Sequence, residues 1–158
     1  MVIDNPIIDL EIDGRLLELE LWDTVAREEY DRLRPLSYPN AAVIVMAFAI
    51  DNRESFRSVS ERWLPEIFHF CGPPTPPILI LGCKSDLRNG NDAVVDGTGL
   101  PGEVTVEEGG ALAKQIGAVG YLECSAKTGE GVDDALEIVA RAAISWDPAK
   151  RKTSCVIM

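Results

Sequence analysis

The sequence predicts an α/β fold in which helices flank a mostly parallel β-sheet. Nearly continuous apolar runs at 42–50, 77–82 and 119–124 have the length and composition of strands that are covered on both faces. Helical patterns lie between and after these runs, and strands that alternate with helices form βαβ units. With 158 residues, of which 46% are hydrophobic, the chain is long enough for one domain with a substantial core.

The first element is a β-hairpin. Apolar and acidic residues alternate along 8–12, and the alternation resumes along 17–21. Between them stands Asp13-Gly14, a pair that favours a tight hairpin turn.

The remaining elements follow from helical spacing and from glycine content. Apolar residues recur every three or four positions along 54–70, 106–116 and 132–146, which predicts three helices. Residues 89–102 contain four glycines and Pro101, which predicts a flexible surface insertion. We expect one domain over 1–146, followed by a short tail over 147–158.

Composition restricts the class of partner. The net charge is −11 and the pI about 4.5, so the body should repel nucleic acid. The cysteines show no metal-ligand spacing and no paired framework, which fits a reduced cytosol. No apolar run reaches the length of a membrane span, and the start of the chain is unlike a signal peptide.

The tail carries a lipidation signal. Cys155 is followed by two aliphatic residues and a terminal Met, the pattern of a prenylated cysteine, with farnesyl favoured. Lys150, Arg151 and Lys152 lie just upstream and would add attraction to an anionic leaflet. We expect a lipid-anchored protein at the cytoplasmic face of a membrane, with a cytosolic pool. An accidental apolar tail is the alternative.

Three segments at predicted strand ends carry polar chemistry. They are Trp22-Asp23-Thr24, Gly82 to Asp86, and Glu123 to Lys127. Open α/β sheets bind their ligands at the carboxyl ends of the strands, so these segments are the candidate site. Each charged residue taken singly is better explained as a solvated loop charge.

With these segments the chain resembles the Rho family of Ras-like small GTPases. The stretch WDTVAREEYDRLRPLSYP, at 22–39, is similar to the family's second switch, and GYLECSAK, at 120–127, is similar to its guanine-contacting loop. The resemblance implies a Ras-like P-loop NTPase fold, GTP or GDP with Mg²⁺ as ligands, and a monomeric signalling protein. It also implies Rho-type regulators and effectors that bind through the Tyr30–Tyr38 region.

The resemblance assigns roles to individual residues. The Asp86 carboxylate would accept two hydrogen bonds from guanine, an arrangement that adenine cannot reproduce. The stem of Lys84 would lie over the base. Ser125, Ala126 and Lys127 belong to the loop whose backbone N–H groups meet the guanine carbonyl. Asp23 would help to hold Mg²⁺ through water.

The phosphate-binding half of the family pattern is absent from this sequence. No G-x-x-x-x-G-K-[ST] motif precedes the hairpin, and Met1 stands where the resemblance places a threonine ligand of Mg²⁺. Backbone amides and a lysine of that motif normally hold the phosphates. We therefore expect nucleotide affinity to collapse.

Substitutions also affect the segments that remain. Arg27 stands where the family has the glutamine that orients the attacking water, and Ala26 replaces a glycine next to the γ-phosphate. Cys83 replaces an asparagine that braces the base loop. We expect weak or no catalysis. Arg27 as a built-in arginine finger is a less favoured alternative.

The missing first strand raises a question about the fold. In Ras-like domains it lies between the strands that correspond to 15–22 and 42–50, so two inner sheet edges would lose their partners. Either these strands close the gap or the chain is not the whole protein. Two functional hypotheses remain open: a Rho-type GTPase that lacks its first segment, and a nucleotide-independent pseudoGTPase interaction module. A nonfunctional gene product is a third possibility.

Overall fold

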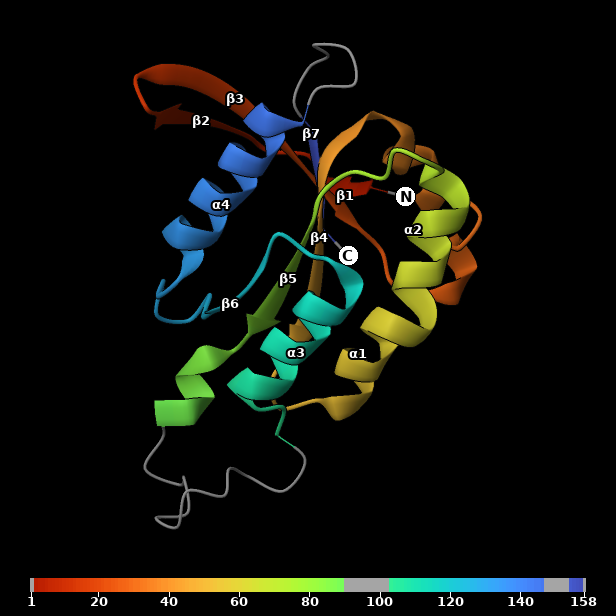
Figure 1. The fold of residues 1–158 in the computed structure, drawn as a ribbon, viewed down its shortest axis with the longest axis vertical. Helices are drawn as coiled ribbons and strands as arrows, with labels where there is room; N and C mark the ends of the chain where they lie inside the picture. Colours follow the sequence, from red (N-terminus) through yellow and green to blue (C-terminus); the bar gives the residue numbers. More distant parts are fainter. Residues whose placement is uncertain (1, 90–102, 147–153, 158) are drawn as a thin grey trace.

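A single β-sheet runs through the centre of the computed structural model, which describes residues 2–89, 103–146 and 154–157 (Figure 1). Among these residues the sheet has seven strands in the order β1-β3-β7-β4-β5-β6, and β2 pairs with β3. The strands are β1 (Val2–Asp4), β2 (Ile7–Ile12), β3 (Arg15–Thr24), β4 (Ala41–Ala49), β5 (Ile78–Cys83), β6 (Gly120–Cys124) and β7 (Ser154–Ile157). The α/β class with a mostly parallel sheet is confirmed.

The predicted hairpin is present as β2 and β3, which pair in register from Ile7–Glu20 to Ile12–Arg15. Asp13 and Gly14 both have positive φ, 50° and 75°, as a two-residue hairpin turn requires. Strand β1, which the alternation pattern did not indicate, continues the same edge of β3.

Helices cover both faces of the parallel strands (Figure 1). Residues Arg53–Cys71 and α3 (Val106–Ile116) lie on one face, where the larger apolar cluster includes Ile44, Met46 and Trp63. Helix α4 (Val132–Ser145) lies on the other face and packs through residues such as Val139. This alternation of buried faces explains why β4 reads as an unbroken apolar run.

The helix predicted over 54–70 is interrupted. It consists of α1 (Arg53–Ser58), a π-helical turn η3 (Val59–Trp63) and α2 (Leu64–Cys71). The amide of Leu64 donates to the carbonyl of Val59, five residues earlier. Pro65 has no N–H and its ring crowds the carbonyl four residues before it, so a regular α-helical ladder cannot pass through this position.

The predicted helices at 106–116 and 132–146 are present with nearly the same bounds, and α3 begins with a capping box at Thr105. Three 3₁₀ segments complete the described structure: η1 (Glu28–Tyr30), η2 (Arg34–Asn40) and η4 (Ser85–Asn89).

Strand β7 comes from the end of the chain and occupies the position between β3 and β4. It is parallel to both: Leu21 and Val43 are the register partners of Cys155, and Trp22 and Ile44 those of Val156. The expected gap is therefore neither left open nor closed by direct pairing of β3 with β4. Residues 90–102 of the predicted insertion and 147–153 of the predicted tail lie outside the described residues. Within the described ranges, no helix is long and apolar enough to cross a bilayer.

Candidate functional site

The three predicted site segments meet at one edge of the sheet. Strands β3, β4, β5 and β6 run in the same direction, so their carboxyl ends lie together. This edge carries Asp23 at the end of β3, Asp51 after β4, Lys84 after β5 and Ser125 after β6. Strands β3 and β5 are three strand spacings apart, or about 14 Å, which separates Asp23 from the other predicted residues.

Asp86 and Ser125 form the centre of the β5–β6 end of the site. The buried Ser125 hydroxyl donates to Asp86 Oδ1 at 2.5 Å and accepts from the backbone N–H groups of Lys127 and Thr128, both at 3.2 Å. The hydrogen bond from Ser125 lowers the pKa of the Asp86 carboxyl, so the group is ionised at neutral pH. We call Lys84, Asp86, Ser125, Ala126 and Lys127 the base corner.

The lysines of the base corner have partners of their own. Lys127 Nζ lies 3.6 Å from Asp86 Oδ2. Lys84, which has a φ of 68°, places its Nζ 2.9 Å and 3.1 Å from the two oxygens of Asp51. The Lys84 side chain is 55% exposed, and exposed ion pairs contribute little free energy. Breaking this ion pair therefore costs little free energy, and the Lys84 side chain is able to move away from Asp51.

Backbone hydrogen bonds close the loop that carries Ser125. Its N–H donates to Glu130 O at 2.9 Å, and its carbonyl accepts from the N–H of Gly129 at 2.8 Å. Gly131 caps α4 with a φ of 73°, and a Cβ there would lie 2.2 Å from Glu123 O. Glycine is required at this close approach, a requirement that the sequence analysis missed because it depends on a neighbouring strand.

The β3 end of the edge has fewer polar groups that fit a ligand. Asp23, Ala26 and Arg27 are all exposed. Among the residues that the structure describes, no group of three or more His, Cys, Asp or Glu side chains is arranged to hold a metal ion. The described residues therefore offer no ready-made cage for Mg²⁺, and the predicted role of Asp23 is an indirect contact through water.

A buried ion cluster fixes the segment that resembles the second switch, and the sequence analysis did not find it. The Arg34 side chain is fully buried and donates to both carboxylate oxygens of Glu66, at 2.9 and 2.7 Å. It also donates to Asp31 Oδ1 at 2.7 Å and to Val25 O at 2.9 Å. Its guanidinium lies 4.6 Å from the centre of the Trp63 ring. Helix α2 thus holds the segment through Glu66.

This cluster narrows the partner surface predicted over Tyr30–Tyr38. Tyr38 is 1% exposed, and its hydroxyl donates to Glu66. Leu33 and Leu36, by contrast, are 49% and 73% exposed. The large apolar side chains that this region exposes are therefore Leu33 and Leu36, and Tyr38 is not among them.

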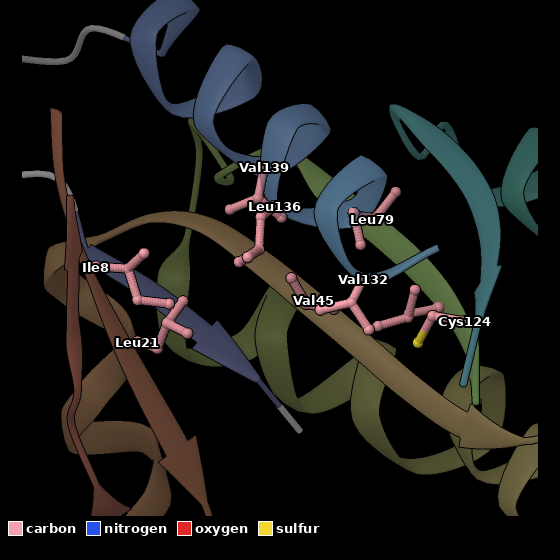
Figure 2. A pocket seen from close by; sticks show the side chains of 10 residues that line it. Ile8, Leu21, Val45, Leu79, Cys124, Val132, Leu136 and Val139 are labelled. Atoms are coloured by element: carbon pink, nitrogen blue, oxygen red, sulfur yellow. The ribbon is translucent and has the colours of Figure 1, made fainter. Parts of the chain in front are cut away.

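An apolar pocket of about 240 Å³ lies between the sheet and α4, and Cys124, the residue before Ser125, is part of its lining (Figure 2). Figure 2 shows Leu136 and Val139 of α4 above Leu21 of β3 and Val45 of β4. None of the base-corner residues lines it. Its lining does not suit a charged nucleotide.

Comparisons with known proteins identify the family. The Ras family model matches residues 1–145. The chain belongs to the Ras family. Over 164 aligned residues it is 44% identical to "GTP-binding protein rho5" of Schizosaccharomyces pombe, covering 99% of this chain and 81% of the relative. Over 155 residues it is 48% identical to "GTP-binding protein rho1" of the same yeast, covering 97% and 75% respectively. Within the Ras family, the chain is a Rho-type small GTPase.

Proposed function

We propose that this chain is a Rho-type signalling protein that recognises guanine and, with the residues of this sequence, binds phosphates weakly. It binds GTP and GDP weakly, and it hydrolyses GTP slowly or not at all. The observation that carries the proposal is the base corner, in which Ser125 orients an ionised Asp86 next to the Lys127 loop. The sequence contains no phosphate-binding motif to complement this corner.

The base corner fits a guanine. Asp86 is an acceptor at neutral pH, and the N1 and N2 groups of guanine are adjacent donors. Because the N–H of Lys127 donates to Ser125, we assign the N–H of Ala126 to the guanine carbonyl oxygen. Lys84 covers the base with its stem after it leaves Asp51. Adenine presents an acceptor and a different donor at these positions, so it should be rejected.

The opposite end of the edge fits the phosphates and Mg²⁺ only in part. Mg²⁺, when bound, neutralises charge on the phosphate oxygens, and Asp23 would hold it through water. Arg27 has five donors and no acceptor, so it cannot orient an attacking water as a glutamine does. The Cβ of Ala26 restricts the backbone where a glycine amide would approach a phosphate. Catalysis is therefore weak even if a nucleotide binds.

The second candidate function is a nucleotide-independent interaction module. It is favoured by the Arg34–Glu66 cluster, which holds the second-switch segment through contacts within the protein. Rho-type regulators or effectors would bind the exposed Leu33 and Leu36, which lie on the segment that this cluster fixes. Partner binding would then be independent of nucleotide.

Cys155 is the proposed prenylation site, with Lys150, Arg151 and Lys152 as the electrostatic part of the anchor. The protein would be monomeric and would divide between the cytoplasmic face of a membrane and the cytosol. Residues of the lipidation signal also form β7, between β3 and β4. One copy of the tail cannot occupy the sheet and insert a lipid in a bilayer at the same time. Membrane anchoring therefore requires release of β7.

A binding experiment tests the proposed function. The purified chain is denatured and chromatographed for bound nucleotide, and the native protein is titrated by NMR with GDP, guanosine and adenosine. We expect no copurified nucleotide and millimolar binding of guanosine and GDP, within about tenfold of each other, since phosphates add few contacts. Adenosine should not bind. Asp86→Ala should abolish binding, and the exposed Asp133→Ala should not.

Two results would contradict the proposal. Copurified GDP, or GDP binding more than about 10³-fold tighter than guanosine, would reveal a functional phosphate site. Effector binding that persists with Asp86→Ala while guanosine binding is lost would favour the interaction module.

In a chain extended with a family P-loop and first switch, nucleotide binding should return before hydrolysis. Hydrolysis should then need Arg27→Gln with Ala26→Gly.

A further inference from the structure

Two cysteines are neighbours at the carboxyl ends of adjacent strands. Cys83 is the last residue of β5, Cys124 is the last residue of β6, and the two are register partners in a parallel ladder. Register partners project from the same face of a sheet, and their Cα atoms lie about 4.7–4.9 Å apart, within the range of about 4.4–6.8 Å that disulfides span. The two thiols also interact, since Cys124 adds to the effect of burial in raising the pKa of the Cys83 thiol.

The pair lies directly beneath the base corner. Cys83 precedes Lys84, and Cys124 precedes Ser125. Figure 2 shows the Cys124 sulfur among the apolar side chains on the α4 face of the sheet. Cys124 is 7% exposed, whereas Cys83 is partly exposed and offers a route for an oxidant. Both cysteines are free thiols in the structure.

We propose that Cys83 and Cys124 form a reversible disulfide that ties the two base-corner loops together. With glutathione disulfide as the oxidant, the Cys83 thiolate attacks one sulfur of the oxidant and releases one glutathione thiolate. The Cys124 thiolate then attacks the Cys83 sulfur of this mixed disulfide and releases the second glutathione. The two cysteines lose two protons and two electrons, and one glutathione disulfide becomes two glutathione molecules. A reducing thiol reverses both steps.

The surroundings of the pair make this reaction slow and selective. Burial raises the pKa of the Cys83 thiol to about 12, so little thiolate is present at neutral pH. Once Cys83 carries glutathione, however, Cys124 is its register partner on the next strand, so the second step is intramolecular. A long-lived mixed disulfide is therefore not expected. Cys71, whose pKa burial raises to about 11, lies on α2 and has no such neighbour among the described residues.

The test uses the full chain with Cys71→Ser and Cys155→Ser, which leaves the pair as its only thiols. After incubation with excess glutathione disulfide, the intact mass should fall by about 2 Da, and dithiothreitol should restore it. Trypsin should release one cross-linked species that joins residues 63–84 to 115–127. The cross-linked species should be absent when Cys83→Ala or Cys124→Ala is added to the same background. Formation of a stable glutathione adduct instead of the internal bond, or no reaction, would overturn the proposal.

Two further measurements complete the experiment. Differential alkylation of the unaltered chain should show Cys83 and Cys124 becoming protected together, which guards against misfolding of the serine variants. Amide exchange in the two base-corner loops should slow by about tenfold on oxidation, and unchanged exchange would overturn the proposed tie between them. Because these readouts need no nucleotide, they remain decisive even if the proposed guanine recognition fails.

Discussion

The two ends of the ligand edge are completed in different ways. At the β5–β6 end, loops that directly follow their strands satisfy one another, as in the bond from Ser125 to Asp86. At the β3–β4 end, the sheet is completed by β7, a segment more than a hundred residues away along the chain. Local loops preserve their geometry without the rest of the site, whereas an inner sheet position depends on whichever strand is available to fill it.

Under the proposed function, this difference explains how base recognition persists where phosphate binding is weak. Base recognition needs acceptors and amides that two short loops supply. Phosphate recognition needs many converging donors and a metal ion, and among the described residues no group of three or more His, Cys, Asp or Glu side chains is arranged to hold a metal. Three changes distinguish the two ends and one tests the tail that supplies β7, from the largest expected effect to the smallest.

Arg34→Met should have the largest effect, because it leaves Glu66 and Asp31 without their buried partner. Breaking a buried ion pair from one side costs about 3–5 kcal/mol, so the free energy of unfolding should fall by that amount in urea titrations. The exposed Arg32→Met is the matched control and should change it by less than about 0.5 kcal/mol. Equal losses from the two variants would show that the cluster does not hold this end.

Neutralising Lys150, Arg151 and Lys152 with glutamine should weaken binding of the prenylated protein to anionic vesicles. Each basic residue contributes about 1 kcal/mol, so the partition coefficient should fall by about 10²-fold at low salt. The loss should shrink in 1 M salt and be absent with uncharged vesicles, because salt does not screen the lipid's apolar transfer. Cys155→Ser should abolish binding. A Cys155→Ser protein that still fractionates with membranes in cells would reveal another anchor.

Val156→Pro should disturb the β3–β4 end without affecting the base corner. Proline cannot donate to the ladder in an inner strand, so we expect a loss of about 2 kcal/mol in unfolding free energy. Amide exchange should rise in Glu20–Asp23 and Ala41–Val45, the segments that β7 pairs with. Val156→Thr keeps the donor and should have little effect. If exchange is the same in both variants, β7 does not occupy this position in solution.

Ser125→Ala should have the smallest effect on stability, about 1 kcal/mol, because it removes one buried hydroxyl from the base corner. The hydrogen bond lowers the folded-state pKa of Asp86, so its stabilisation is present above the unfolded value of about 3.9 and is lost as pH falls through the folded value. The difference between variant and parent should therefore shrink in acid. The exposed Thr128→Ala serves as the control, and a pH-independent difference would contradict the assigned contact.

Much of the fold and the base corner could be predicted from local patterns. The Asp13-Gly14 turn, the apolar strands and two of the helices depend on neighbours within a few residues. The order of the site segments was enough to predict that Asp23, Asp86 and Ser125 would share one edge, because parallel strands end together. The interruption at Pro65 could also have been predicted, since proline disfavours a regular helix interior.

The sequence by itself determined the class of fold and the family, and it predicted that the base-corner residues lie at one edge of the sheet. Only the tertiary structure decided the position of β7, the burial of Arg34 and the adjacency of Cys83 and Cys124. A short apolar segment has the same local sequence pattern whether it is a free tail or a strand. Which of the two it becomes depends on unpaired backbone groups of β3 and β4, which lie far away along the chain. An arginine such as Arg34 is expected to be exposed, and its burial depends on a carboxylate and an aromatic ring that are distant in the sequence. These outcomes follow from long-range pairing, for which no local pattern carries the signal.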